Sequence, residues 1–401
     1  MDPAIHTFSV PFQFPVHFTW DAFAAENRVF VDTIRRLEPD RRHRVLVVID
    51  QQVAAAHPTL PAEIESYFGA YPQSLELAGP LVIVPGGEAV KNDLTHPFAL
   101  LQRINEVGLD RQSFMAVIGG GAVLDMASFA GAIAHRSVRV VRLPTTVLSQ
   151  GDSGFAVKNG VNLFGKKNFI GTFVPPFAVI NDIRYLESLD HRDVISGVAE
   201  AIKVSLLRDP AFFAYLERDA SRIVDGDRDV LATVIRRSAE LHLAHICGNG
   251  DPFELGSARP LDFGHWAAHK LESLTAHRLR HGEAVAIGMA IDIVYSVRMG
   301  YLDRACAERI LRLLETIGFR LWDDAMGDRD PSGGLALITG LREFREHLGG
   351  ELHITLLRDI GNAFEVTSMD ESIVRASMDE LASRASTRLG SGSSHTAARG
   401  R

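Results

Sequence analysis

Phe114-Met-Ala-Val-Ile-Gly-Gly-Gly121 is an apolar run that ends in three glycines; Ala-Val-Leu-Asp125 follows it, and then a segment of small residues from Met126 to Ala134. This order predicts a buried strand, a tight turn and a helix. Glycines at such a turn let the backbone approach a pyrophosphate, which the free N–H groups at the start of the helix stabilise. The spacing is not G-x-G-x-x-G, so tight packing alone would also explain the turn.

Two similar apolar runs precede this stretch, Val45-Leu-Val-Val-Ile-Asp50 and Leu81-Val-Ile-Val-Pro-Gly-Gly87. The segments between the runs, about 52–70 and 93–108, have helical spacing, and a further short strand is expected at 139–143. Strands that alternate with helices predict a parallel, doubly wound sheet of the Rossmann type. Residues 4–19 alternate apolar and polar residues, which suggests an edge strand or a hairpin.

From about residue 190 the hydrophobic spacing becomes helical and stays so. Helices are expected at 191–207, 211–224, 228–247, 283–299, 303–317 and 369–385. We therefore predict an α/β domain at 1–185, a helical domain at 186–385 and a disordered Gly/Ser-rich tail at 386–401. The active site is expected in the cleft between the two domains.

The composition excludes several classes of protein. A hydrophobic content of 46% without a long apolar run predicts a soluble protein with no membrane span, and we find no signal peptide. Two cysteines make a disulfide framework unexpected and favour a cytoplasmic location. A net charge of −8 argues against nucleic acid as a partner. An anionic small molecule must then be bound by a local cluster of basic residues.

Metal-binding residue types gather near residue 265. If residues 264–275 are helical, His265, His269 and Glu272 fall on one face, and a loop could return His281 to the same point. Imidazoles completed by a carboxylate are usual ligands of a catalytic Zn²⁺ ion. The alternative is that one histidine is a core residue and another is solvated.

Other polar residues stand where a nucleotide or a phosphate could bind. Asp50 ends a strand and could accept from a ribose hydroxyl group. Residues 144–168 form a long polar stretch, and long ordered loops are often functional. Lys203 lies on the same helix face as Glu200, which fits either a site or a structural salt bridge. The remaining candidates of this kind, each of which could also be a solvated loop residue, are Glu88, Lys91, Lys158, Asn162, Lys167 and Asn168.

Taken in order, these motifs resemble the sugar phosphate cyclases, the superfamily headed by 3-dehydroquinate synthase. The resemblance runs from about Val45 to Gly361. The matching blocks are Gly119-Gly-Gly…Asp125, Pro144-Thr-Thr-x-Leu-Ser-Gln-x-Asp-Ser153, Lys158-x3-Asn162, Lys167-Asn168, Gly197-x-Ala-Glu-x-x-Lys203, Gly264-His-x3-His269-x-x-Glu272 and His281-Gly-Glu-Ala-Val285. It implies the dehydroquinate synthase-like fold, an N-terminal Rossmann-like NAD-binding domain followed by an all-α metal-binding domain.

The resemblance also implies roles for individual residues. Glu200, His265 and His281 would bind the metal, usually Zn²⁺ with Co²⁺ as an alternative, and His269 would then contact the substrate. NAD would be bound by Asp50, Glu88, Lys91, Gly119, Gly120, Gly121, Asp125, Thr145, Thr146 and Lys167. The sugar phosphate would be surrounded by Asp152, Lys158, Asn162, Asn168 and Lys203, with Arg136 reaching its phosphate across a homodimer interface.

The implied reaction is a cycle in one pocket. NAD⁺ takes a hydride from a secondary alcohol, and the ketone formed acidifies the neighbouring C–H so that phosphate can be eliminated. The hydride is then returned, the sugar ring opens, and an intramolecular aldol addition closes a carbocycle. NAD is regenerated in each turnover, so the enzyme would be a carbon–oxygen lyase.

The chain departs from the synthase pattern at several positions. The helix before the metal helix carries His242 and His245 where the synthase has a lysine, and Asp262 replaces an asparagine. A Lys-Lys pair near the C-terminal strand is replaced by a run that contains His347. These changes are similar to cyclases that use sedoheptulose 7-phosphate, since a substrate without a carboxylate needs fewer cations. His269 resembles the dehydroquinate branch.

Two further interpretations remain. Metal-dependent polyol dehydrogenases share this fold and NAD, but they lack the phosphate-handling set of Lys158, Asn162 and Lys203. A degenerate cyclase kept as a scaffold would have broken metal ligands, whereas here all three are present.

Overall fold

The computed structural model describes residues 3–164, 166–248, 252–253, 261–347 and 350–392. The chain divides into two compact units, Met1–Ser188 and Leu189–Arg401. The first contains a parallel sheet covered by helices and the second is mainly helical, so the predicted fold class is confirmed. Within the described ranges, no helix has both the length and the apolarity needed to cross a membrane.

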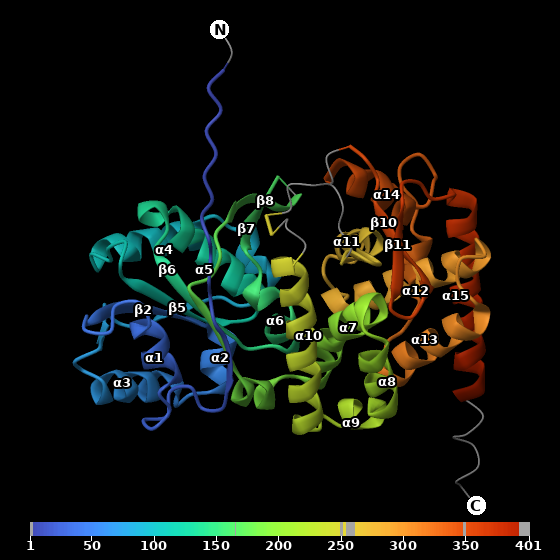
Figure 1. Cartoon of the computed structure of the whole chain (residues 1–401). Helices are drawn as coiled ribbons and strands as arrows, with labels where there is room; N and C mark the ends of the chain where they lie inside the picture. The colour runs from blue at the N-terminus through green and yellow to red at the C-terminus, as the bar shows by residue number, and fades with distance from the viewer. Residues whose placement is uncertain (1–2, 165, 249–251, 254–260, 348–349, 393–401) are drawn as a thin grey trace, which may run out of the picture. The chain divides into compact units, whose positions relative to one another are not determined.

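The N-terminal unit is built on a seven-stranded sheet of order β1-β9-β6-β5-β2-β3, with β4 paired to β2 (Figure 1). Its strands are β1 (Val16–Thr19), β2 (His43–Asp50), β3 (Leu75–Leu77), β4 (Val82–Val84), β5 (Phe114–Gly119), β6 (Arg139–Pro144) and β9 (Ala178–Asp182). All pairs are parallel, and Gly119 lies opposite Pro144. The carboxyl ends of β2, β5 and β6 therefore meet at one edge of the sheet, which we call the carboxyl edge.

Helices cover both faces of this sheet (Figure 1). Val45, Val47 and Ile49 of β2 pack with α1 (Val29–Arg35) and α3 (Leu60–Ala70) on one side. Leu46 and Val48 pack with α4 (Thr95–Glu106) and α5 (Gly121–Ile133) on the other. Because successive side chains of a strand point to opposite faces, the uninterrupted apolar run of β2 serves two cores.

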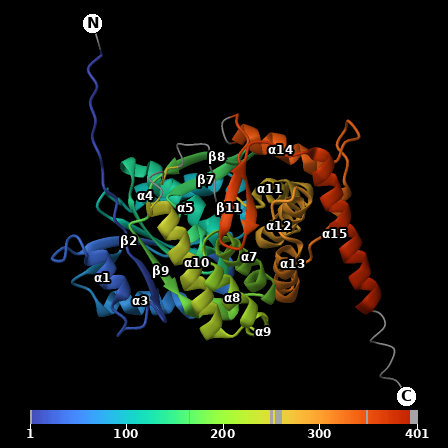
Figure 2. The ribbon, with the colours of Figure 1, turned by 45° about the vertical axis from the view of Figure 1, so that its right-hand side comes forward.

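Two segments of this unit differ from the sequence prediction. The helix expected at 52–70 is broken into α2 (Gln51–Ala56) and α3, since Pro58 disfavours helical backbone at the residue before it. Only Val16–Thr19 of the segment at 4–19 forms a strand. The residues before it run outward as an extended chain (Figures 1 and 2), and Phe8 is 87% exposed.

The polar stretch at 144–168 is more regular than the expected loop. It contains α6 (Val147–Gly151) and a hairpin of β7 (Lys158–Leu163) and β8 (Lys166–Phe173). Short 3₁₀ turns complete the unit: η1 (Glu88–Asn92), η2 (Ala134–Arg136), η3 (Ser153–Phe155) and η4 (Ile183–Ser188).

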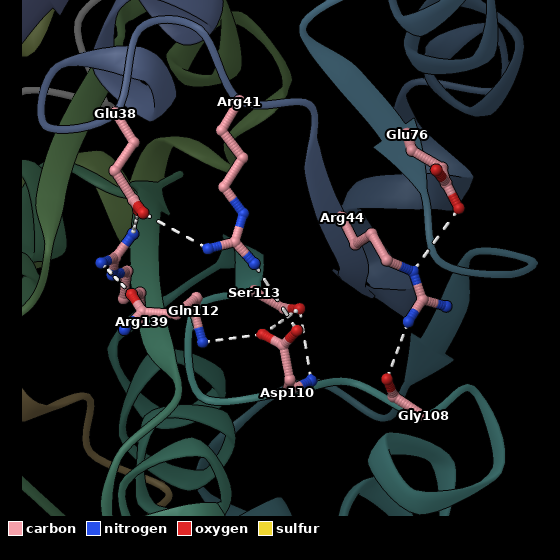
Figure 3. A network of polar contacts seen from close by, with 9 residues as sticks. All are labelled: Glu38, Arg41, Arg44, Glu76, Gly108, Asp110, Gln112, Ser113 and Arg139. Atoms are coloured by element: carbon pink, nitrogen blue, oxygen red, sulfur yellow. Dashed lines mark hydrogen bonds and ion pairs between the residues drawn. The ribbon is translucent and has the colours of Figure 1, made fainter.

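A charged network closes the amino ends of the strands, opposite the carboxyl edge (Figure 3). Arg139, which begins β6, donates to Glu38 Oε2 at 2.6 Å and also to Gln112. Arg44 of β2 donates to the carbonyl of Gly108 at 2.7 Å. These contacts join loops that follow α1 and α4 to the start of the sheet.

The C-terminal unit is a helical bundle with one small hairpin. Its elements are α7 (His191–Arg208), α8 (Pro210–Arg218), α9 (Ala220–Val224), α10 (Arg228–Gly248), α11 (His265–Leu274), α12 (His281–Arg298), α13 (Arg304–Ile317), η5 (Asp324–Gly327), α14 (Ala336–His347), β10 (Ile354–Asp359), β11 (Asn362–Val366) and α15 (Glu371–Gly392). Helix α12 packs against α7, α11, α13 and α15, and it is buried all round from Ala284 to Ser296. A helix that is apolar on every side is expected at the centre of a bundle.

Helix α14 and the hairpin β10–β11 were not predicted. Helix α15 continues to Gly392, past residue 385 where we placed the end of the helical domain. Its last turns accommodate serine and threonine because their hydroxyls donate to the preceding turn, Ser386 to Ala382 O and Thr387 to Ser383 O.

Candidate active site

Three helices of the C-terminal unit bring a carboxylate and two imidazoles together. Glu200 lies in the middle of α7, His265 is the first residue of α11, and His281 is the first residue of α12. One potential ligand atom from each lies within 4.8 Å of the other two. Two imidazole nitrogens and a carboxylate oxygen match the three protein ligands of a catalytic zinc site.

The two carboxylate oxygens of Glu200 have different neighbours. Oε1 lies 3.7 Å from His265 Nε2 and 3.5 Å from His281 Nε2, whereas Oε2 forms an ion pair with Lys203. The Glu200 side chain is 1% exposed, so Oε1 is shielded from water where it faces the two imidazoles. A buried carboxylate oxygen that faces two imidazole nitrogens fits a bound cation well.

The site favours the protonation states that bind metal. Burial alone would raise the pKa of Glu200, but the charge of Lys203 and the nearby imidazoles outweigh it and hold this pKa well below its usual value. For His265, burial and then the charge of Lys203 lower the pKa well below its usual value. The carboxylate is thus ionised and the imidazole neutral near pH 7, as metal ligands must be.

Outer contacts orient both imidazoles. His265 Nδ1 lies 3.2 Å from the carbonyl oxygen of Phe263, and a proton donated there leaves Nε2 as the lone-pair nitrogen. His281 Nδ1 lies 3.4 Å from Glu272 Oε1, on the far side of the ring from Glu200. A carboxylate or carbonyl behind a ligating histidine is a usual arrangement in metal sites.

Glycines allow the three helices to approach this closely. A Cβ on Gly288 of α12 would lie 2.0 Å from the carbonyl oxygen of Gly264, the residue before His265. A Cβ on Gly282 would lie 1.8 Å from the carbonyl oxygen of Ser196 in α7. Gly264 itself has φ +77°, a left-handed conformation that favours glycine. The backbone of α12 is therefore in direct contact with α7 at Gly282 and with the start of α11 at Gly288, close to the candidate metal ligands.

The other predicted metal-binding residues do not join this cluster. His269 is exposed, and its ring centroid lies 5.5 Å from that of His265. Glu272 contacts His281 from behind rather than sharing the ligand position. The geometry therefore favours Glu200, His265 and His281 over the face of His265, His269 and Glu272 that helical spacing suggested.

The residues that depart from the synthase pattern are placed as follows. His242 is 1% exposed and its Nδ1 lies 2.8 Å from the carbonyl oxygen of Ser238, whereas His245 is half-buried. Asp262 is half-buried, and its carbonyl accepts from the backbone N–H of His265. The side chain of His347 lies outside the described part of the chain.

In the N-terminal unit, Asp50 and the predicted glycines meet at the carboxyl edge. Asp50 Oδ1 accepts from Gln52 N at 2.8 Å, and burial, only partly offset by such backbone hydrogen bonds, raises the pKa of this carboxyl. A Cβ on Gly119 would lie 2.9 Å from Val123, and one on Gly121 would lie 2.8 Å from Ser153 Oγ. Tight packing against Val123 therefore favours glycine at 119, whereas a Cβ on Gly121 would displace the Ser153 hydroxyl and one on Gly120 would make only ordinary contacts.

A buried lysine links several of the predicted nucleotide and substrate residues. Lys91 is 2% exposed, and its Nζ donates to Asp125 Oδ2 at 2.8 Å and to Asn168 Oδ1 at 2.5 Å. Glu88 Oε1 lies 3.9 Å from the same nitrogen. Residues predicted from three separate motifs are thus gathered at one place beside α5.

Asn162 completes this network from β7. Its Oδ1 accepts from Asn168 N at 2.8 Å, and its Nδ2 donates to Asn92 Oδ1 at 2.8 Å. Asn92 was not predicted, although it directly follows Lys91. Its position at the end of η1 is the signal that could have identified it.

Arg142 was also missed, although it is a charged residue in the buried part of β6. It is 0% exposed and donates to Ser128 Oγ at 3.0 Å, to the carbonyls of Gly154 and Ala156 at 3.1 and 2.7 Å, and to Asn159. These hydrogen bonds hold the loop between Asp152 and Lys158 against the sheet.

The remaining candidates in this unit lie around the same loops. Thr145 is buried, and Thr146 caps α6 by accepting from Ser149 N at 3.1 Å. Lys158 and Lys167 lie on the hairpin β7–β8. Arg136 is exposed and has φ 62°, between two residues that also have positive φ, and strain of this kind is typical of functional segments.

Comparison with known proteins identifies the family. The profile described as 3-dehydroquinate synthase N-terminal matches residues 81–196, and the profile described as 3-dehydroquinate synthase C-terminal matches residues 197–331. A 3-dehydroquinate synthase from Cereibacter sphaeroides is 34% identical over 348 residues, which cover 86% of this chain and 90% of that protein. The chain therefore belongs to the 3-dehydroquinate synthase family within the sugar phosphate cyclases, as the resemblance predicted.

Solved structures share the whole architecture. ValA, a 2-epi-5-epi-valiolone synthase from Streptomyces hygroscopicus subsp. jinggangensis 5008 with NAD⁺ and Zn²⁺ bound, has a TM-score of 0.83 at 25% identity and covers 95% of this chain and 100% of its own. A 2-deoxy-scyllo-inosose synthase complexed with carbaglucose-6-phosphate, NAD⁺ and Co²⁺ has a TM-score of 0.72 at 22% identity and covers 92% of this chain and 96% of its own. The chain is thus a 3-dehydroquinate synthase-like cyclase in fold and family.

Proposed function

We propose that the protein is an NAD- and metal-dependent lyase that eliminates phosphate from a seven-carbon sugar phosphate and closes its carbon chain into a ring. The observation that carries the proposal is the cluster of the buried Glu200 and His265 with the half-buried His281, with Lys203 beside it. We also propose that the enzyme is a cytoplasmic homodimer.

Residues of the C-terminal unit would bind the metal and stabilise charge on the substrate. Glu200, His265 and His281 would hold Zn²⁺ or Co²⁺, which as a Lewis acid polarises a hydroxyl or carbonyl group of the substrate. Lys203, fixed against Glu200 Oε2, supplies a positive charge where the phosphate or a developing oxyanion would lie. His269, exposed one turn after His265, would contact the substrate rather than the metal.

Residues of the N-terminal unit would bind NAD and the phosphate group of the substrate. The start of α5 with Gly120 and the nearby Asp50 would receive the pyrophosphate and ribose of NAD, which accepts a hydride and returns it within each turnover. The network around Lys91 would hold the rest of the nucleotide. Lys158 and Arg136, both exposed cations, would bind the phosphate group of the substrate.

The activity is tested by phosphate release from 3-deoxy-arabino-heptulosonate 7-phosphate with NAD⁺ and Zn²⁺, with the product identified by NMR. Lys203→Ala and His281→Ala should each abolish turnover while circular dichroism shows an intact fold. Full activity in either variant would contradict the proposed site. Arg236→Ala, on an exposed part of α10, is the matched control and should keep native turnover.

A second substrate is favoured by Asp262, which stands where the synthase pattern has an asparagine. Sedoheptulose 7-phosphate lacks a carboxylate, so a site with one more acidic residue suits it better than an acid substrate. Turnover of this sugar alone would assign the chain to the valiolone-type cyclases. Net NADH release without phosphate release would instead indicate a polyol dehydrogenase.

A further inference from the structure

A carboxylate lies at the centre of the bundle, next to the candidate metal site but outside it. Asp292 is a 0% exposed residue in the buried helix α12. Its Oδ2 accepts from the backbone N–H of Gly264 at 3.0 Å, and its Oδ1 accepts from Trp266 Nε1 at 2.9 Å. The two donors are the residues immediately before and after His265.

This arrangement is costly if it serves only to join two helices. Among the described residues, no basic side chain forms an ion pair with Asp292, and burial raises the pKa of its carboxyl to about 7. A neutral side chain could join α11 to α12 without the penalty of burying an acid. A carboxylate differs from an amide in one respect that matters here, because both of its oxygens accept and it can hold two N–H donors at once.

The two hydrogen bonds restrict His265 from both sides. The bond to Gly264 N fixes the backbone where α11 begins, and the bond to Trp266 fixes a ring that is itself 1% exposed. The backbone that carries His265 is thus held on both sides, which fixes the position of its Cα and Cβ atoms. Its Nδ1 faces the carbonyl of Phe263, so its Nε2 is directed toward Glu200 Oε1.

We propose that Asp292 is a positioning residue that fixes His265 in the orientation required for metal binding, by accepting hydrogen bonds from the residues on both sides of it. The inference rests on the proposed metal site and adds a residue that never touches the metal. Outer residues of this kind typically change metal affinity about 10- to 100-fold.

The experiment compares Zn²⁺ affinities, measured by competition with a chelating dye, in the full-length metal-free chain and its variants. Asp292→Asn keeps the size of the side chain but places an N–H₂ group against one of the two donors, and should weaken Zn²⁺ binding about 10- to 100-fold. Trp266→Phe removes one donor and should weaken it less. Asp182→Asn is the matched control, because Asp182 is also buried and accepts backbone N–H groups on both of its oxygens, from Asp21 at 3.1 Å, Ala22 at 2.8 Å and Arg184 at 3.1 Å, but lies in the N-terminal unit.

The visible absorption of bound Co²⁺ provides a second measurement that a purely structural role would leave unchanged. It reports ligand geometry, so the Asn variant should shift the bands, whereas the control variant should keep the native spectrum. Native affinity and a native spectrum in Asp292→Asn would overturn the inference. If that variant does not fold, Trp266→Phe decides the question in the same way. Failure of the native chain itself to bind Zn²⁺ would instead contradict the proposed metal site.

Discussion

Replacing Gly288 with alanine should damage the metal site while most of the fold remains. The new Cβ would lie 2.0 Å from the carbonyl oxygen of Gly264, and ordinary contact begins at 3.4 Å. The start of α11 must therefore move away from α12 by up to 1.4 Å, and His265 moves with it. Metal–ligand distances tolerate only about 0.2 Å. We expect Zn²⁺ affinity to fall at least about 100-fold, with a loss of about 1–3 kcal/mol in the free energy of unfolding from overpacking.

The assay is dye competition for Zn²⁺ together with urea unfolding of the metal-free chain. Gly69→Ala is the control, because Gly69 lies in helix α3 and a Cβ there meets nothing within 4 Å. It should leave Zn²⁺ affinity unchanged and stabilise the chain by about 0.5–1 kcal/mol. Native Zn²⁺ affinity in Gly288→Ala would refute the argument that backbone contact between α11 and α12 sets the ligand geometry.

Three further predictions concern other parts of the molecule. Arg142→Met leaves the carbonyls of Gly154 and Ala156 without their buried donor, so urea unfolding should show a loss of at least about 2 kcal/mol, and an unchanged midpoint would contradict the anchoring role. Asp292 has a pKa of about 7 in the folded chain and about 3.9 in the unfolded chain, so it binds its proton more tightly when folded. Its contribution to stability is therefore present at low pH and is lost as pH rises from about 4 to 7, up to about 4 kcal/mol. Metal-free Asp292→Asn should lose less stability between pH 5 and pH 8 than the native chain, and equal losses in the two chains would contradict the raised pKa. Arg139→Ala removes the ion pair with Glu38 and should lower the free energy of unfolding by about 1 kcal/mol, less in 1 M NaCl, and a loss that salt does not change would exclude a charge effect.

The sequence was informative where a local pattern alone decides the structure. The apolar runs that end at Asp50 and Gly119 predicted buried strands, because a strand covered on both faces needs no polar residue until it ends. The start of α5 followed from the glycines and the small residues after them. The broken helix at Pro58 was missed only because helical spacing continues on both sides of the proline.

The candidate metal site was harder to predict, because its residues come from three separate helices. Helical spacing placed His269 and Glu272 beside His265, but His265 begins α11 and faces α7, so the turn that follows points elsewhere. Glu200 entered through the resemblance, since nothing local connects α7 with α11. Asp292 and Arg142 had a usable signal, a single charge within an apolar run, that we did not interpret.

The contacts of Gly264, Gly282 and Gly288 have a consequence for comparing and designing such proteins. The three candidate metal ligands are held close together because no side chains stand next to them at these glycines. A related chain could keep both histidines and the glutamate and still be inactive through one added methyl group at Gly282 or Gly288. Anyone transplanting this site into a new helical scaffold would have to copy the glycines together with the ligands.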